Sequence, residues 1–347
     1  MTQPDNNGPR YVIDGSFLAT RPTGLHRVAR ALAASAIDAG LPAEVWAPRG
    51  TTDPLVDRTL PTGTGRLGRR LWEQVVLPAN ARGRTIVSLT NTAPLVAPGV
   101  VLVHDLAPLV GPQWFVGSMR LYAATVLAAA RRARLVVTVS NAVRGELVGH
   151  GVAADRIAVV PPAIDDRFAP ASSAAVEAVR HAFGLHRPYA VLVGWTNPRK
   201  DAATAVAAHR QVARDTPHDL VLVGGPEPTF APVVLPSLPS VHRLGHVIDQ
   251  QLVALLTGAA VALYPSRYEG YGLPPLEAMA CGTPAVVSDI PALRESAGGL
   301  ARLAPVGDVA AWAAALADGL AGRLSCPSPP SRSWRTAGQE LVAALPS

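Results

Sequence analysis

Lysine is almost absent from this chain: of 31 basic residues among 347, only Lys200 is a lysine. Cysteine is nearly as scarce, because Cys281 and Cys326 are too few for a disulfide framework and too far apart for a zinc knuckle, which indicates a reducing compartment. Apolar runs also stay short, and the longest, residues 252–265, is below the roughly 18 residues that a membrane-spanning helix needs. These absences exclude a disulfide scaffold and a membrane-spanning protein.

The N-terminal segment, MTQPDNNGPR, has no basic region followed by an apolar stretch, so we expect no secretory signal and a cytoplasmic location. The net charge of +6 and the pI near 9.9 suit nucleic acid, an anionic membrane surface or a phosphorylated ligand. Apart from short clusters the arginines are scattered, with no basic tail or interleaved aromatic residues, which disfavours nucleic acid. A phosphorylated ligand is therefore the favoured partner class.

Short β-branched runs alternate with alanine-rich helical stretches, a pattern typical of parallel α/β units. We expect strands in the first half of the chain at 11–14, 43–47, 85–89, 100–104, 135–139 and 157–160, and in the second half at 189–194, 220–224, 241–244, 260–264 and 284–288. These strands predict an α/β fold with two Rossmann-like, doubly wound parallel sheets in domains that face a cleft. In such sheets, ligands bind beyond the carboxyl ends of the strands.

The domain boundary is expected in the proline-rich stretch at residues 161–184. We expect an N-terminal domain over residues 1–168 and a C-terminal domain over residues 169–330. A last helix, within residues 331–347, follows a second proline-rich break. Ser140 stands where the N-cap of a helix is expected.

The segment from Glu269 to Glu277, EGYGLPPLE, carries the sharpest functional signal. Gly270 and Gly272 allow close approach of the backbone to a ligand, and the two prolines after them suit a helix start. Glu277 is expected in the first helical turn, and Glu269 in the preceding loop. Because a helix N-terminus attracts phosphate and carboxylates accept hydrogen bonds from hydroxyls, the segment predicts an anionic ligand that also carries hydroxyl groups.

This segment resembles the E-x7-E motif of retaining GT-B glycosyltransferases of the family 4 type, also called glycosyl transferases group 1. The resemblance implies that Glu277 binds the ribose of a nucleotide and that Glu269 binds hydroxyls of the donor sugar. It also implies that backbone N–H groups contact the sugar and phosphate, at Gly270, Tyr271, Gly272 and Leu273. It further implies that the N-terminal domain, completed by the helix within residues 331–347, is the acceptor domain, and that the C-terminal domain binds the nucleotide-sugar donor.

The stretch VLVGWTNPRKD is similar to the strand and loop that carry the diphosphate-binding cations of this family, here Arg199 and Lys200. Two fixed cations stabilise the charge that develops on a departing diphosphate, so no metal is required. The resemblance thereby gives the single lysine a role. The alternative is a pair of surface cations at a helix start, where the helix dipole disfavours them.

The stretch VHRLGHVIDQQ resembles the part of the family fold that places backbone groups against the base, near His246 and Val247. A metal site at His242 and His246 is the rival interpretation, and it lacks a third ligand. We therefore expect no metal and no cofactor, with the nucleotide-diphosphate sugar as a substrate.

In the first half of the chain, Gly24 lies at a predicted helix start and resembles the N-terminal glycine loop of the family, which approaches the diphosphate or the acceptor. An ordinary glycine turn explains it equally well. Arg27 is a further candidate for acceptor binding. His104 and Asp105 match an HD pair of related enzymes. The match implies that His104 contacts the sugar or the acceptor and polarises a reacting group, and that Asp105 binds the acceptor; core or capping roles are the alternative.

The resemblance predicts transfer of a mannose-, rhamnose- or hexose-like sugar from a nucleotide-diphosphate sugar to an acceptor hydroxyl, with retained anomeric configuration. The acceptor stays open between a lipid-linked envelope glycan, reached by peripheral contact with the inner face of the membrane, and a small natural product. An epimerase or hydrolase acting on nucleotide-diphosphate sugars, and a non-catalytic sensor of sugar nucleotides, are the alternatives.

Overall fold

A computed structural model describes residues 10–20, 23–63, 65–117, 119–329 and 331–346. The N-terminal segment considered for a secretory signal lies almost wholly outside these residues. The chain forms two compact units. Unit 1 comprises residues 1–106, 120–163 and 332–347, and unit 2 comprises residues 107–119 and 164–331.

Unit 1 is built on a seven-stranded parallel sheet with the order β3-β2-β1-β4-β5-β6-β7. Its strands are β1 (Tyr11–Asp14), β2 (Ala43–Pro48), β3 (Arg58–Leu60), β4 (Thr85–Ser88), β5 (Val100–Val103), β6 (Leu135–Thr138) and β7 (Ile157–Val159). Most of these strands are buried on both faces, as helix-covered parallel strands require. The strand order reverses between β1 and β4, which makes their carboxyl ends the topological switch point of this sheet.

Unit 2 is built on a six-stranded parallel sheet with the order β10-β9-β8-β11-β12-β13. Its strands are β8 (Tyr189–Val193), β9 (Asp219–Val223), β10 (Val241–Gly245), β11 (Val261–Tyr264), β12 (Ala285–Ser288) and β13 (Arg302–Ala304). The order reverses between β8 and β11. The second switch point therefore lies at the carboxyl ends of these two strands.

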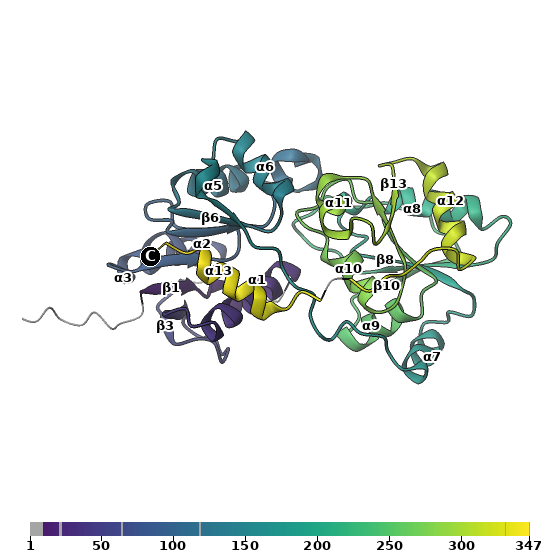
Figure 1. Cartoon of the computed structure of the whole chain (residues 1–347), viewed down its shortest axis with the longest axis horizontal. Helices are drawn as coiled ribbons and strands as arrows, with labels where there is room; N and C mark the ends of the chain where they lie inside the picture. The colour runs from purple at the N-terminus through teal and green to yellow at the C-terminus, as the bar shows by residue number, and fades with distance from the viewer. Residues whose placement is uncertain (1–9, 21–22, 64, 118, 330, 347) are drawn as a thin grey trace, which may run out of the picture. The chain divides into compact units, whose positions relative to one another are not determined.

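Helices cover the sheet of unit 1, and the last helix of the chain lies beside the first (Figure 1). The α-helices are α1 (Gly24–Asp38), α2 (Gly65–Leu71), α3 (Leu77–Asn80), α5 (Met119–Arg132), α6 (Asn141–Gly149) and α13 (Trp334–Ala344), and a π-helical turn, η2 (Trp72–Val76), connects α2 to α3. Ser140 caps α6, where its hydroxyl accepts from Val143 N at 3.2 Å, as predicted.

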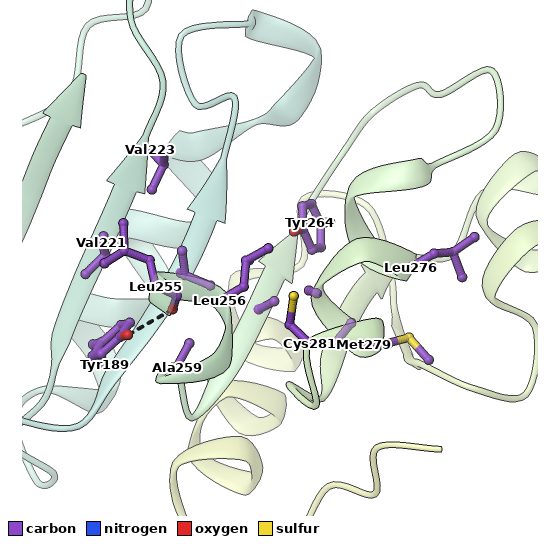
Figure 2. Packing of buried hydrophobic residues seen from close by; sticks show 14 of the residues in the cluster. Tyr189, Val221, Val223, Leu255, Leu256, Ala259, Tyr264, Leu276, Met279 and Cys281 are labelled. Carbon is purple, nitrogen blue, oxygen red and sulfur yellow. Dashed lines mark hydrogen bonds between the residues drawn. The ribbon is translucent and has the colours of Figure 1, made fainter. Parts of the chain in front are cut away.

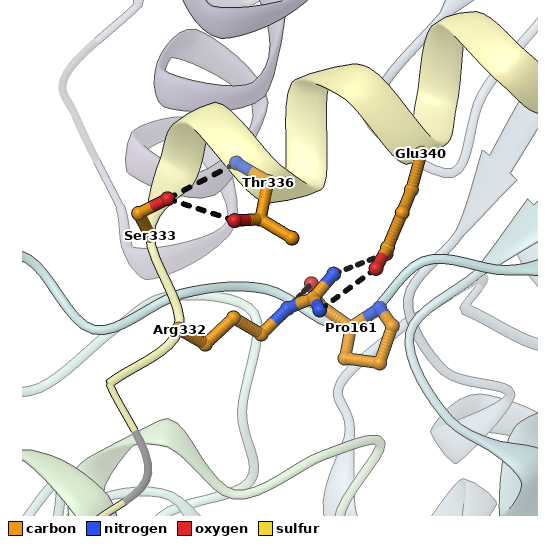
Figure 3. A network of polar contacts seen from close by, with 5 residues as sticks. All are labelled: Pro161, Arg332, Ser333, Thr336 and Glu340. Atoms are coloured by element: carbon orange, nitrogen blue, oxygen red, sulfur yellow. Dashed lines mark hydrogen bonds and ion pairs between the residues drawn. The ribbon is translucent and has the colours of Figure 1, made fainter.

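The start of α13 is anchored to unit 1 by Arg332, which precedes the helix and donates to Pro161 O at 2.9 Å (Figure 3). Arg332 also forms an ion pair with Glu340 of α13. Ser333 caps the helix through Thr336 N at 3.1 Å. Gly338 lies so close to α1 that an added Cβ would be 2.4 Å from the backbone of Ser35. The C-terminal helix is thus an integral part of unit 1.

In unit 2, the α-helices are α4 (Ala107–Val110), α7 (Ser173–Ala182), α8 (Ala202–Val212), α9 (Asp249–Thr257), α10 (Leu273–Ala280), α11 (Pro291–Ala297) and α12 (Val309–Leu320). Figure 2 shows the core on one face of the sheet, where side chains of α9 and α10 meet those of β8, β9 and β11. The Tyr189 hydroxyl donates to Leu255 O at 2.8 Å, so this large side chain is buried without an unmet polar group. Both cysteines are free thiols, and Cys281 belongs to this core.

The predicted α/β class is confirmed, and each of the eleven expected strands is present within one or two residues of its expected bounds. Two strands were missed, β3 and β13. Both are three-residue edge strands with exposed polar positions, so they lack the apolar run that marks a buried strand. Within the described residues, no helix is both long and apolar enough to cross a bilayer.

Candidate nucleotide-sugar site

The switch point of unit 2 brings together two loops that are far apart in the sequence. The loop after β8 contains η5 (Pro198–Lys200), and the loop after β11 leads through Glu269 to α10. Because β8 and β11 are neighbours in the sheet, their carboxyl ends place Lys200 beside Glu269. The two sequence motifs for which a diphosphate site and a sugar site were predicted therefore lie side by side.

The central contact is an ion pair between Lys200 Nζ and Glu269 Oε1 at 2.5 Å, in which each side chain is only 10% exposed. The Ser266 hydroxyl donates to the same carboxylate oxygen at 2.7 Å. Burial raises the pKa of Glu269, but Lys200, Arg199 and the hydrogen bonds outweigh it and lower the pKa below its usual value. Glu269 is therefore an ionised acceptor, suited to hydroxyl groups.

Two further contacts join the two loops, and two hydrogen bonds within the loop after β8 hold Arg199 in place. Arg267 N donates to Arg199 O at 2.7 Å, and the Arg267 guanidinium pairs with Asp201 at 2.8 Å. Asn197 accepts from Arg199 N at 3.1 Å and from Arg199 Nε at 3.4 Å. Asp201 adopts a left-handed conformation, with φ 44°, at the sharp turn into α8. The cations are thus fixed before any ligand arrives, which favours electrostatic catalysis.

Helix α10 begins at Leu273, and Gly272 is its N-cap with φ 103°. Glu277 is consequently the fifth residue of the helix, so the prediction that it lies in the first turn was wrong. Pro274 and Pro275 fill the first turn instead, and neither needs an N–H partner there. Glu277 is half-buried. Burial is the main cause that raises the pKa of the Tyr264 hydroxyl, and the nearby Glu277 and Glu269 carboxylates raise it further. Both carboxylates therefore lie near the end of β11.

Glycines lie at the carboxyl ends of the neighbouring strands, and no role at the site was predicted for them from the sequence. Gly194 and Gly224 directly follow β8 and β9, and Gly245 is the last residue of β10; their φ angles are 81°, 123° and 62°. An added Cβ at Gly225 would meet the His246 ring at 2.6 Å, so His246 packs over this glycine and is itself exposed. His246 and Val247 thus follow β10 at the same sheet edge as Lys200 and Glu269.

The rival metal interpretation finds no support in the side-chain arrangement: among the described residues, no group of three or more His, Cys, Asp or Glu side chains is placed to hold a metal ion. His242 instead lies 3.5 Å from Asp219.

In unit 1, His104 and Asp105 follow β5 at the carboxyl edge of the sheet. His104 Nε2 lies 2.9 Å from Leu89 O, so this nitrogen carries the proton and Nδ1 is left as an acceptor. The backbone N–H of His104 donates to Asn91 Oδ1 at 2.6 Å. Burial lowers the pKa of His104, which keeps the imidazole neutral.

Gly24 and Arg27 lie in the first turn of α1, and both are exposed. Thr23 caps this helix, accepting from His26 N at 3.4 Å. An added Cβ at Gly24 would have no atom of the described residues within 4 Å.

A group of polar residues at the switch point of unit 1 was not predicted from the sequence. Asp14 ends β1, Asn91 and Thr92 follow β4, and Glu73 and Tyr122 come from η2 and α5. The sequence did contain one signal for this group, because Asp14 is a charged residue at the end of an otherwise apolar strand. Glu73 had no comparable signal, because a π-helical turn leaves no recognisable spacing in a sequence.

Comparison with known proteins identifies the family to which this chain belongs. The model of glycosyl transferases group 1 matches residues 187–321, which contain the Lys200 and Glu269 loops, and the model of glycosyltransferase family 4 matches residues 22–168. The chain belongs to the group 1, family 4 type glycosyltransferases. The two-domain Rossmann-like architecture is accordingly that of the GT-B class.

Among relatives of this glycosyltransferase family member, the O-antigen chain mannosyltransferase B of Escherichia coli is 32% identical over 191 residues, covering 52% of this chain and 50% of the relative. A D-inositol 3-phosphate glycosyltransferase of Geodermatophilus obscurus is 31% identical over 293 residues, covering 76% and 62%. The chain thus matches between half and two thirds of the length of these relatives.

A solved structure of Anabaena Alr3699/HepE in complex with UDP and glucose matches 97% of this chain and 95% of its own, with a TM-score of 0.66 and 17% identity. At this identity the likeness concerns the fold.

Proposed function

We propose that this protein transfers a mannose-, rhamnose- or hexose-like sugar from a nucleotide-diphosphate sugar to an acceptor hydroxyl, with retained configuration and without a metal. The observation that carries the proposal is the buried Lys200–Glu269 pair at the switch point of unit 2. One site there offers cations for a diphosphate and an ionised carboxylate for sugar hydroxyls. The names of the relatives, a mannosyltransferase and another glycosyltransferase, support the same reaction class.

In this proposal unit 2 is the donor domain. Lys200 and Arg199 stabilise the diphosphate as the glycosidic bond breaks, and Glu269 accepts hydrogen bonds from the donor sugar. Glu277 binds the ribose, and the edge at His246 and Val247 lies against the base. Backbone N–H groups at the start of α10 contact the sugar and phosphate, from Gly270, Tyr271, Gly272 and Leu273.

Unit 1 is the acceptor domain in this proposal. His104 offers Nδ1 to a hydroxyl of the sugar or the acceptor, while Asp105 and Arg27 contribute to acceptor binding and Gly24 to the approach of the diphosphate or acceptor. The departing diphosphate receives the acceptor proton, so no side-chain base is required.

The test incubates the protein with UDP-, GDP- and dTDP-sugars, with and without simple glycosides as acceptors, and follows nucleotide release and the product anomer by NMR. We expect release that depends on the acceptor and an α-linked product from an α-linked donor. A β-linked product would contradict retention. Isomerised or hydrolysed donor without an acceptor would favour an epimerase or hydrolase, and tight binding without release would favour a sensor.

A further inference from the structure

The switch point of unit 1 holds buried polar groups that the proposed donor chemistry does not use. Asp14 and Ser88 lie one residue beyond the paired residues Ile13 and Val87 of β1 and β4, so they are neighbours at the carboxyl edge. Asp14 is 2% exposed and Ser88 is fully buried. Asp14 Oδ1 accepts from Ser16 N at 2.9 Å. Asp14 Oδ2 and Ser88 Oγ have no hydrogen-bond partner within the described part of the chain.

Both side chains point toward the face of the sheet that η2 covers. Val12 and Ile86, two residues earlier on each strand, pack with Trp72 in one core cluster, and side chains alternate along a strand. The Trp72 indole N–H is also buried, with no partner among the described residues. Buried polar groups are normally satisfied, so three unmet groups on one face indicate a place where hydrogen bonds are made to something else.

Glu73 follows Trp72 in the same π-helical turn, and its half-buried side chain lies near Asp14. The Gln74 amide donates to Glu73 Oε1 at 2.7 Å and to Ala93 O at 3.0 Å, which ties the turn to the loop after β4. Burial and the nearby Asp14 raise the pKa of Glu73 to about 7, although Thr92, Gln74 and the exposed Arg70 act to lower it. Burial likewise raises the pKa of Asp14 to about 6.

The polar group extends across the edge of the sheet to the end of β5. The half-buried Tyr122 hydroxyl bonds to Asn91, and its pKa is raised first by burial and then by Asp105 and Glu73. Asn91, held with φ 65°, also accepts from the backbone of His104. Carboxyl groups from β1 and η2, the phenol from α5, and the amide and imidazole that follow β4 and β5 thus converge on one switch point.

We propose that this group, Asp14, Glu73, Asn91 and Tyr122, binds an uncharged sugar residue of the acceptor, an inference that rests on the proposed transfer. Near neutral pH the Glu73 carboxyl, with its pKa raised to about 7, is partly protonated, so it both donates to and accepts from sugar hydroxyls, while the Asp14 carboxylate accepts. The same carboxyls repel a phosphate when they ionise, and no cation-binding set of three ligands exists among the described residues. A neutral glycan is therefore favoured over a phosphorylated acceptor.

The test uses the whole chain, residues 1–347. Binding of methyl α-glycosides of mannose and glucose, and of their 6-phosphates, is measured by saturation-transfer NMR with the wild type, Glu73→Gln, Glu73→Lys and Asp14→Asn. Glu177→Gln is the matched control, because that side chain is 79% exposed on α7. A nucleoside diphosphate titration of each sample shows independently whether the donor site works.

We expect the wild type to bind a neutral glycoside and to bind its 6-phosphate about tenfold more weakly. Glu73→Gln should reduce this discrimination, Glu73→Lys should reverse it, and Glu177→Gln should leave it unchanged. A purely structural Glu73 would not reverse a charge preference. Equal affinities for neutral and phosphorylated probes, or no binding of either, with intact nucleotide binding would overturn this inference alone. Loss of nucleotide binding in the wild type would instead contradict the proposed function.

Discussion

Glu269 and Glu277 have different surroundings, and this difference separates their expected roles. Glu269 is held by Lys200 and Ser266 in the loop, where the proposed sugar lies. Glu277 belongs to the second turn of α10. We expect Glu269→Gln to lower kcat about 100-fold with little change in nucleotide affinity, because its hydrogen bonds strengthen in the transition state.

Glu277→Gln should instead weaken nucleotide binding about tenfold. Steady-state kinetics and nucleotide titration of both variants, with Glu177→Gln as the control, measure this division. Identical small effects at both positions would remove both glutamates from the site.

Asp14 should make stability depend on pH in a definite direction. Its pKa rises from 3.8 to about 6 on folding, so between these values the native state keeps a proton that the unfolded state has released. The free energy of unfolding therefore falls as the pH rises, by about 3 kcal/mol once the pH exceeds 6. Asp14→Asn should remove this loss, raising the melting temperature near pH 8 but not near pH 4. An equal change at both pH values would show that the carboxyl does not titrate as described.

At the scale of the secondary-structure elements, the start of α10 depends on the backbone of Gly272. Its φ of 103° strains any other residue, and a Cβ would lie 2.4 Å from Leu293 Cδ2. Gly272→Ala should therefore cost about 1–3 kcal/mol and also impair nucleotide binding.

Gly145→Ala is the matched control, because this exposed glycine of α6 has open space around it. Alanine there should stabilise the protein by about 0.5–1 kcal/mol. Denaturant unfolding of both variants measures these changes in the free energy of unfolding. An unchanged free energy of unfolding in Gly272→Ala would show that the cap conformation is dispensable.

The sequence predicted the central strands because they are apolar runs, and it predicted Lys200 and Glu269 because their motifs are specific. Their ion pair was not predictable, since it depends on β8 and β11 being neighbours across the switch point. Glu277 was wrongly predicted in the first turn because the helix starts at Leu273, before the prolines, which places Glu277 in the second turn. The group around Asp14 and Glu73 was missed because it joins four elements without a shared motif.

At the scale of the whole molecule, the chain enters unit 2 twice, at residues 107–119 and 164–331, and ends in unit 1 with α13. Gly338 permits the close packing of α13 on α1, since a Cβ would meet Ser35 C at 2.4 Å. Gly338→Ala should force the two helices apart and destabilise unit 1 by about 1–3 kcal/mol. Hydrogen exchange should then rise in peptides of β1 and α1 but not in those of β8 and β9. An equal loss of protection against hydrogen exchange in both units would contradict a destabilisation that is confined to unit 1.

The central claim is that unit 2 binds a nucleotide-diphosphate sugar through Lys200 and Glu269. Its most direct test is calorimetric titration of UDP, GDP and dTDP into the wild type and into a Lys200→Met, Glu269→Gln double variant, which leaves no unpaired buried charge. We predict that at least one of these nucleotides binds the wild type and that the double variant binds it at least about tenfold more weakly. Binding of equal strength to both proteins, or of none of the three nucleotides to the wild type, would contradict the claim.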